Sequence, residues 1–187
     1  MRQMMSVAVL SAMMFGSLAM AAPPVFAEET SCQGRIGART VDNLRVPQGS
    51  NCTLNGTTVK GTIKVERGAT LQAKGVRVVG NVQAENHKYV SIVASSRIGG
   101  SIQIDQGGAF QVLDSTAAGI QVKSNTGAST LRDNRVNSDI QVFSHSGGVD
   151  ITSNSVDGNL QCKENSPAPT GGGNVVQGNM EDQCENL

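Results

Sequence analysis

Aromatic side chains are almost absent from this chain of 187 residues. It has no tryptophan and one tyrosine, and aromatic residues make up 3% of the total. Proteins that bind sugars or single-stranded nucleic acids usually stack these ligands on aromatic rings. The composition therefore disfavours both modes of binding, and we expect no nucleic-acid partner.

Long hydrophobic runs are confined to the N-terminus. Residues 7–22 are apolar, Arg2 is the only charged residue in this region, and Ala27 stands where a signal peptidase would cut. These features predict a secretory signal peptide over residues 1–27 and a single domain over residues 28–187. No second run of about twenty apolar residues follows, so we expect no membrane-spanning segment.

Charge is also scarce, and it is unevenly divided. The chain has 15 Lys/Arg and 15 Asp/Glu. Residues 28–100 contain ten basic and five acidic residues, whereas residues 101–187 contain four and ten. Ordinary scatter of surface charge is one interpretation. The alternative is that the basic and acidic ends attract each other, which favours end-to-end self-association, or that the basic half captures an anionic partner.

What the chain does contain is a repeat of about twenty residues. Each copy has two apolar residues separated by one polar residue, as in Ile102-Gln103-Ile104, and further apolar residues follow in short alternating bursts between turn residues. This pattern predicts an all-β fold, a single-stranded parallel β-helix of about 7–8 coils with about 20 residues per coil. Right-handed winding is expected, because left-handed helices follow a stricter six-residue rhythm. The first apolar residue of each copy, here called the anchor, is Leu44, Ile63, Val82, Ile102, Ile120, Ile140, Leu160 and, in a worn copy, Met180.

Stacking of the coils would turn each repeat position into a column along the rod. We interpret the outward glutamines one residue after the anchor as a structural ladder; the alternative is a flat face that meets a repetitive partner. The polar residues fourteen positions after the anchor suit left-handed turns and stacked amides. The glutamine column is Gln83, Gln103, Gln121, Gln141 and Gln161, preceded by Lys64; the turn column is Ser96, Thr116, Asn134, Asn154 and Asn174; and a small apolar column sixteen residues after the anchor is Val79, Ile98, Ala118, Val136, Val156 and Val176.

The four cysteines suit an oxidising compartment, so we expect an exported, periplasmic or extracellular protein. Cys32 and Cys52 are 20 residues apart, and Cys162 and Cys184 are 22 apart. One turn of the repeat brings residues so spaced onto adjacent coils, within disulfide reach. We therefore predict Cys32–Cys52 at the first coil and Cys162–Cys184 at the last, because the other pairings would cross most of the rod.

Three residues after the anchor, Glu66, Glu85 and Asp105 fall on consecutive coils, followed by Lys123. Like charges on neighbouring strands are destabilising. A solvated, partly salt-bridged ladder is one interpretation, and a site for a hard cation such as calcium is another. Paired carboxylates at this spacing could also hydrolyse a glycoside. The turns are only a few residues long, so we expect no walls of a cleft around this column.

The histidines offer no metal site. His87 and His145 both lie five residues after their anchors, but three coils apart, about 14 Å by strand spacing. No Ser/His/Asp set emerges. The Gly-rich residues 170–173 are followed by no Lys-Ser/Thr pair, so they are interpreted as a turn, and we expect no cofactor.

The C-terminal part contains a distinctive set of motifs: residues 158–165, Pro167-Ala168-Pro169, 171–174, Gly178-Asn179 and Gln183-Cys184. It resembles the closing motif of a group of uncharacterised secreted bacterial proteins. This resemblance implies an exported β-helix and brings no activity with it. More loosely, the rod is similar to bactofilins, small β-helices that polymerise end to end, although the signal peptide and the cysteines depart from that cytoplasmic family.

Together these features favour a non-enzymatic binding or structural protein of the bacterial envelope or exterior. Its partner would be a polymer, another protein or a second copy of the chain. One alternative is a minimal polysaccharide-degrading enzyme that uses Glu66, Glu85 and Asp105, similar in architecture to pectate-lyase-like β-helices. Fold analogy alone does not confer that chemistry. The other alternative is a self-assembling, adhesin-like module.

Overall fold

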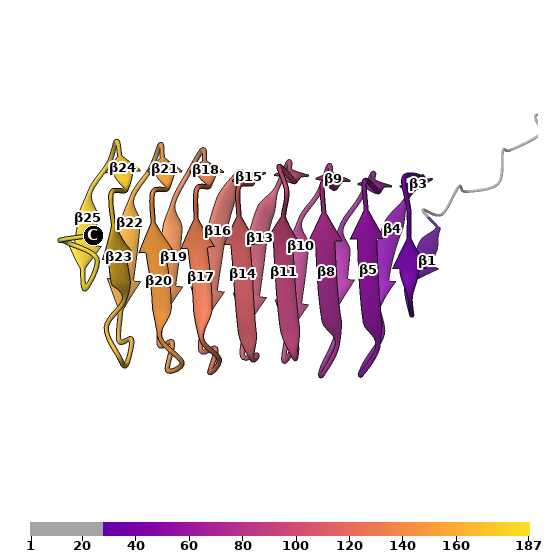
Figure 1. Cartoon of the computed structure of the whole chain (residues 1–187), viewed down its shortest axis with the longest axis horizontal. Helices are drawn as coiled ribbons and strands as arrows, with labels where there is room; N and C mark the ends of the chain where they lie inside the picture. Colours follow the sequence, from indigo (N-terminus) through magenta and orange to yellow (C-terminus); the bar gives the residue numbers. More distant parts are fainter. Residues whose placement is uncertain (1–27) are drawn as a thin grey trace, which may run out of the picture.

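The computed structural model describes residues 28–187, whose regular structure consists of β-strands only. The strands wind into one rod of about eight coils with roughly 19 residues each, and every full coil supplies one strand to each of three parallel sheets (Figure 1). The parallel β-helix predicted from the repeat is therefore confirmed. The predicted signal peptide, residues 1–27, lies outside the described residues.

The three sheets, named A, B and C, follow one another in each coil. Sheet A contains β1 (Glu29–Ser31), β4 (Asn43–Val46), β7 (Ile63–Val65), β10 (Val82–Glu85), β13 (Ser101–Asp105), β16 (Gly119–Lys123), β19 (Ile140–Phe143), β22 (Leu160–Lys163) and β25 (Met180–Asp182). Sheet B contains β2 (Arg35–Ile36), β5 (Asn51–Asn55), β8 (Thr70–Lys74), β11 (Tyr89–Val93), β14 (Ala109–Leu113), β17 (Ser129–Arg132), β20 (Val149–Thr152) and β23 (Thr170–Gly172). Sheet C contains β3 (Thr40–Val41), β6 (Thr58–Val59), β9 (Arg77–Val78), β12 (Arg97–Ile98), β15 (Thr116–Ala117), β18 (Arg135–Val136), β21 (Ser155–Val156) and β24 (Val175–Val176).

The winding is right-handed, as expected. In Figure 1 the chain advances from right to left, the strands of sheet B run upward in front, and those of sheet A run downward behind them. Each coil runs up sheet B, across sheet C and down sheet A. The chain therefore turns clockwise when it is viewed along its direction of advance, which is right-handed winding.

The predicted anchors stand in register along sheet A. Alternation places the anchor and the residue two positions later inside the rod, with one polar residue between them facing outward. Ile102 and Ile104 are therefore buried on either side of Gln103. The anchors pair from coil to coil in the order Leu44, Ile63, Val82, Ile102, Ile120, Ile140, Leu160 and Met180.

Two members of the predicted small apolar column are displaced by one residue. Val78, not Val79, pairs with Ile98 and is buried, whereas Val79 is 56% exposed. In the same way Ala117, rather than Ala118, occupies the inward position. A fixed number of residues from the anchor does not predict the inward position here, because the turns of different coils differ in length by one or two residues.

The predicted turn column needs one correction of the same kind. Thr116 is exposed on sheet C, and Ser115 is the buried residue whose backbone N–H donates to Asn134 Oδ1 (3.2 Å). The preceding coil has two left-handed residues at this corner, Ala94 and Ser95, whereas the coil of Ser115 has only Asp114. The shorter turn moves the buried position one residue closer to its anchor.

The asparagine part of the turn column is confirmed. Asn134 Nδ2 donates to Asn154 Oδ1 (3.0 Å), and Asn154 Nδ2 donates to Asn174 Oδ1 (2.9 Å). Each of these amides also donates to a backbone carbonyl on the sheet B strand of the preceding coil. For Asn154 the acceptor is the carbonyl of Leu131 on β17 (2.9 Å). The column therefore joins successive coils at the corner between sheets B and C.

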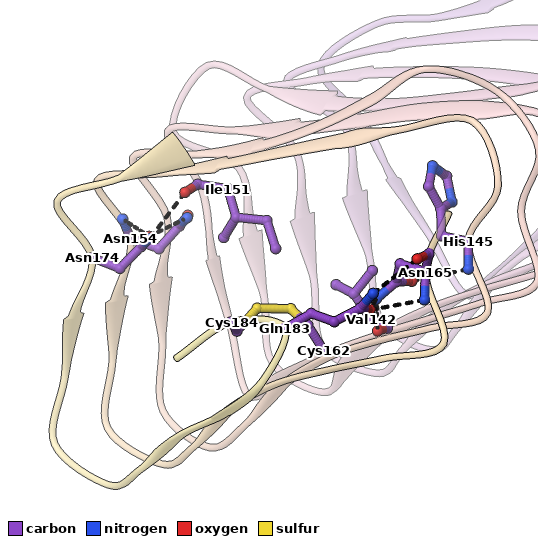
Figure 2. The surroundings of a disulfide bond; sticks show 9 residues. All are labelled: Val142, His145, Ile151, Asn154, Cys162, Asn165, Asn174, Gln183 and Cys184. Carbon is purple, nitrogen blue, oxygen red and sulfur yellow. Dashed lines mark hydrogen bonds between the residues drawn. A yellow bond between two sulfur atoms is a disulfide. The ribbon is translucent and has the colours of Figure 1, made fainter. Parts of the chain in front are cut away.

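Both predicted disulfides are present, with Cα–Cα distances of 5.5 Å for Cys32–Cys52 and 5.2 Å for Cys162–Cys184. They lie inside the rod at its two ends. The residues two positions after the anchors form a second inward column of sheet A. Cys162 lies in this column next to Val142, and Cys32 lies in it one coil before Val46. Figure 2 shows the C-terminal disulfide in the interior, between two corners that carry hydrogen-bonded amides.

Candidate functional site

The outward face of sheet A carries the predicted glutamine column, and its members are hydrogen bonded to one another. Gln83 Nε2 donates to Gln103 Oε1 (2.9 Å), and Gln141 Nε2 donates to Gln161 Oε1 (2.7 Å). A weaker contact of 3.4 Å joins Gln103 to Gln121. The amides thus stand in fixed order along the rod, each with capacity for further hydrogen bonds toward solvent.

A shallow groove of about 470 Å³ follows this column over five consecutive strands, β7 to β19. Strand spacing gives it a length of about 20 Å along the rod. As the short turns predict, no loop walls the column: the groove is lined by side chains of the sheet itself. Its polar and aromatic lining is Lys64, Gln83, Gln103, Gln121, Gln141, Glu85, Asp105, Lys123 and Phe143.

The groove is electrically balanced. Its charged lining residues are two lysines, Lys64 and Lys123, and two carboxylates, Glu85 and Asp105. Asp105 pairs in register with Glu85 on one side and with Lys123 on the other, as the sequence predicted. A ligand in this groove therefore meets charges of both signs and a row of amides, and not a field of one sign.

Glu66 does not join the other two carboxylates. Its Oε1 lies 3.4 Å from Arg45 Nη1, and its Oε2 accepts the backbone N–H of Gln48 (3.0 Å). Within residues 28–187 no three His, Cys, Asp or Glu side chains are grouped so that they could hold a metal ion. Glu66, Glu85 and Asp105 are therefore separated into an ion-paired residue and a neighbouring pair.

Glu85 and Asp105 differ in their access to solvent. Glu85 is exposed, whereas one oxygen of Asp105, Oδ1, is buried and has no hydrogen-bond partner among the described residues. A carboxylate oxygen on the floor of a groove is a ready acceptor for a ligand hydroxyl or amide.

The sequence analysis missed a second amide column, at the corner between sheets A and B. Asn125 Oδ1 accepts the backbone N–H of Gly107 (2.8 Å), and Asn165 Oδ1 accepts that of His145 (2.9 Å). Figure 2 shows Asn165 between His145 and Gln183 at this corner. Asn125 and Asn165 lie at the repeat position of the histidines, five residues after the anchor, so the signal was present in the repeat.

The two histidines are interior residues of this corner, and not surface ligands. His87 is 3% exposed, and neither ring nitrogen has a hydrogen-bond partner among the described residues; burial lowers its pKa to about 4. His145 Nε2 lies 3.0 Å from the carbonyl of Gly148, and burial also lowers the pKa of His145. Both rings are therefore neutral at pH 7 and serve the packing of the turns.

No helix within residues 28–187 could span a membrane. Comparison with models of protein families, with curated proteins and with solved structures gives no match for this chain. The function must therefore be inferred from the outward side chains of the three sheets.

Proposed function

We propose that this protein is an exported, non-enzymatic binding protein of the bacterial envelope or exterior that holds an uncharged linear polysaccharide along sheet A. The observation that carries the proposal is the groove of about 470 Å³ over the glutamine column. The two disulfides support export, because such bonds persist in oxidising compartments.

The form of the groove supports a polymer. It follows five strands and is shallow, so an extended ligand would contact many equivalent positions, whereas a small molecule would fill only part of it. The amides repeat at strand spacing, about 4.8 Å, and each offers both donors and acceptors. A chain of hydroxyl-bearing units can meet such a row repeatedly.

The chemistry of the lining supports an uncharged sugar polymer. Two lysines and two carboxylates cancel, so no net field favours a polyanion or a polycation here. Phe143 adds one half-buried aromatic ring on which a sugar ring can stack. Sugar binding by stacked aromatic rings is what the composition disfavours, and the groove offers this one ring only, so the row of glutamine amides would supply most of the contacts.

The test is affinity electrophoresis of residues 28–187 in gels that contain dextran, glucomannan or chito-oligosaccharides. The variant Gln103→Ala/Gln121→Ala removes the centre of the amide row. The matched control Gln72→Ala/Gln111→Ala removes two outward glutamines of sheet B. We expect at least one polymer to retard the protein, the sheet A variant to lose about tenfold in affinity, and the control to lose less than about twofold.

Other outcomes oppose the proposal. Retardation by none of the three polymers would contradict it, and so would equal losses in the variant and its control. Cleavage of a polymer by the unmodified protein, abolished by Glu85→Gln or Asp105→Asn, would favour the polysaccharide-degrading enzyme instead.

A further inference from the structure

The outward face of sheet C carries two arginines without a carboxylate partner. Arg77 on β9 and Arg97 on β12 are paired in register, and both side chains are exposed. Neither forms an ion pair within residues 28–187. Two guanidinium groups on adjacent strands repel each other, so this arrangement is unfavourable without an anion.

Two other cations on or beside sheet C have carboxylate partners. Lys60 Nζ lies 3.0 Å from Asp42 Oδ1, and Arg135 Nη2 lies 3.7 Å from Asp157 Oδ2. Asp42 and Asp157 both occupy the outward position that follows the strand of sheet C in their coils. In the coils of the two unpaired arginines this position holds small or apolar residues, Val79, Gly99 and, in the next coil, Ala118.

The acidic residue before β15, Asp114, forms no ion pair with either arginine. Its Oδ2 accepts a hydrogen bond from Ser95 Oγ (2.9 Å) at the corner between sheets B and C. Arg77 and Arg97 therefore form a basic patch without a carboxylate partner among the described residues.

A shallow hollow of about 290 Å³ lies at these arginines. Thr116 and Asn137 add a hydroxyl and an amide to its lining, and Val79, which is 56% exposed, adds an apolar surface. No aromatic residue lines it, so stacked nucleobases would find no platform there.

We propose that this hollow on sheet C binds a carboxylate of an acidic polysaccharide, a site separate from the groove on sheet A. The guanidinium fork matches a carboxylate with two parallel hydrogen bonds. The hydroxyl and amide groups would meet sugar hydroxyls, and Val79 would pack against the C–H face of a sugar ring. The proposal does not depend on the function proposed for sheet A.

The test measures the affinity of residues 28–187 for polygalacturonate by isothermal titration calorimetry. The variant Arg77→Gln/Arg97→Gln removes both forks. The matched control Arg132→Gln/Arg135→Gln removes the same amount of charge from two arginines that are already ion paired, with Asp133 at 3.6 Å and Asp157 at 3.7 Å. We expect the first variant to bind at least about tenfold more weakly and the control less than about threefold.

Two further variants sharpen the result. Arg77→Lys/Arg97→Lys keeps the charge but not the fork, so it should recover only part of the affinity. Gln103→Ala/Gln121→Ala on sheet A should bind polygalacturonate as the unmodified protein does, which separates this site from the groove.

Three results would overturn the proposal. The first is no binding of polygalacturonate by the unmodified protein. The second is an equal loss in the two double arginine-to-glutamine variants, which would show general attraction of charge. The third is binding of an oligodeoxynucleotide of equal charge at least as tightly, with the same dependence on Arg77 and Arg97.

Discussion

The two halves of the rod make the same corners with different residues. Up to residue 75, the left-handed positions of the turns are glycines, with φ between 58° and 68°. From Asn86 onward, most of the corresponding positions are held by residues with side chains at φ between 46° and 61°. The glycines are Gly49, Gly56, Gly68 and Gly75, and the later residues are Asn86, Ala94, Ser95, Gln106, Asp114, Ser124, Asp133, Ser144, Ser153, Glu164 and Asp182.

From Ser124 onward, most of these strained positions are followed directly by a buried amide. A residue with a side chain in this conformation costs roughly 1 kcal/mol or more. Next to Asp133 and Ser153 stand Asn134 and Asn154, which hydrogen bond to each other and to backbone groups of adjacent coils. The turns up to Gly75 need no such compensation because glycine adopts the conformation freely. The comparison indicates that amides hold most turns from Ser124 onward, and backbone freedom those up to Gly75.

The largest expected effect comes from breaking an amide column. Asn154 makes four hydrogen bonds, to Asn134, Asn174 and the carbonyl of Leu131. Ser96, its counterpart in the coil of Ala94 and Ser95, where no amide stands at this corner, makes two, accepting from Val76 N–H and donating to the carbonyl of Val93. At about 1 kcal/mol per bond, Asn154→Ala should lower the free energy of unfolding by about 4 kcal/mol and Ser96→Ala by about 2 kcal/mol.

Urea denaturation followed by circular dichroism measures both values, with Gln72→Ala on the surface of sheet B as the control. Equal losses for Asn154→Ala and Ser96→Ala would contradict the idea that the buried amides hold the later corners more firmly than a hydroxyl does.

The second largest loss of stability is expected when a disulfide at either end of the rod is removed. Each disulfide closes a loop of about 20 residues, so Cys32→Ser/Cys52→Ser and Cys162→Ser/Cys184→Ser should each cost about 3 kcal/mol. The last coil keeps a second connection, because Asn165 N–H donates to Gln183 Oε1 (2.8 Å) and Gln183 Nε2 donates to the carbonyl of Asn165 (2.9 Å).

Hydrogen exchange of the two cysteine variants therefore distinguishes the ends. We expect the N-terminal coil, residues 29–46, to lose its protection when its disulfide is removed, and residues 165–187 to keep part of theirs. Greater loss at the C-terminal end would show that the Asn165–Gln183 pair contributes nothing.

These corners also show which parts of the fold could be predicted from sequence. The anchors and the disulfides could be, because alternating aliphatic residues with one period fix which side chains enter a narrow interior. The exact corner positions could not be. One residue more at Ala94–Ser95 than at Asp114 shifts every later position in its coil, and no apolar pattern marks such a turn.

The candidate site, too, could be predicted from the sequence only in part. Register alone placed the glutamine column and the Glu85–Asp105 pair on one face of sheet A. The diversion of Glu66 to Arg45 could not be foreseen, because it depends on side-chain conformations across neighbouring coils. The groove depends on such conformations too, so its presence came only with the structure.

A third prediction concerns His87, which occupies the corner position that Asn125 and Asn165 fill in later coils. Its folded pKa of about 4 lies below the ordinary value of 6.5. Above pH 6.5 the ring is neutral in both states, so stability is complete. As pH falls from 6.5 toward 4, the unfolded chain takes up the proton first and the folded state loses stability. The expected loss from His87 between pH 7.5 and pH 5 is about 2 kcal/mol.

Replacing His87 with Asn, the residue at this position in the coils of Asn125 and Asn165, should remove most of that loss, as measured by urea denaturation at several pH values. His145→Asn is the control for the other buried ring, whose pKa is lowered as well. A pH dependence unchanged in His87→Asn would show that other groups control the acid response.

The smallest effect tests the glycines directly. A Cβ on Gly75 would lie 3.5 Å from the carbonyl oxygen of Ala94, an ordinary contact, so Gly75→Ala changes little besides the strain at φ 58°. That strain should lower the free energy of unfolding by about 1 kcal/mol. In the second half Ser153→Gly relieves a similar strain but frees the unfolded chain, so the two effects nearly cancel and the change should stay within about 0.5 kcal/mol. Thermal or urea unfolding of the two variants decides the point. If Gly75→Ala is as neutral as Ser153→Gly, glycine is not what allows the first half to turn without amides.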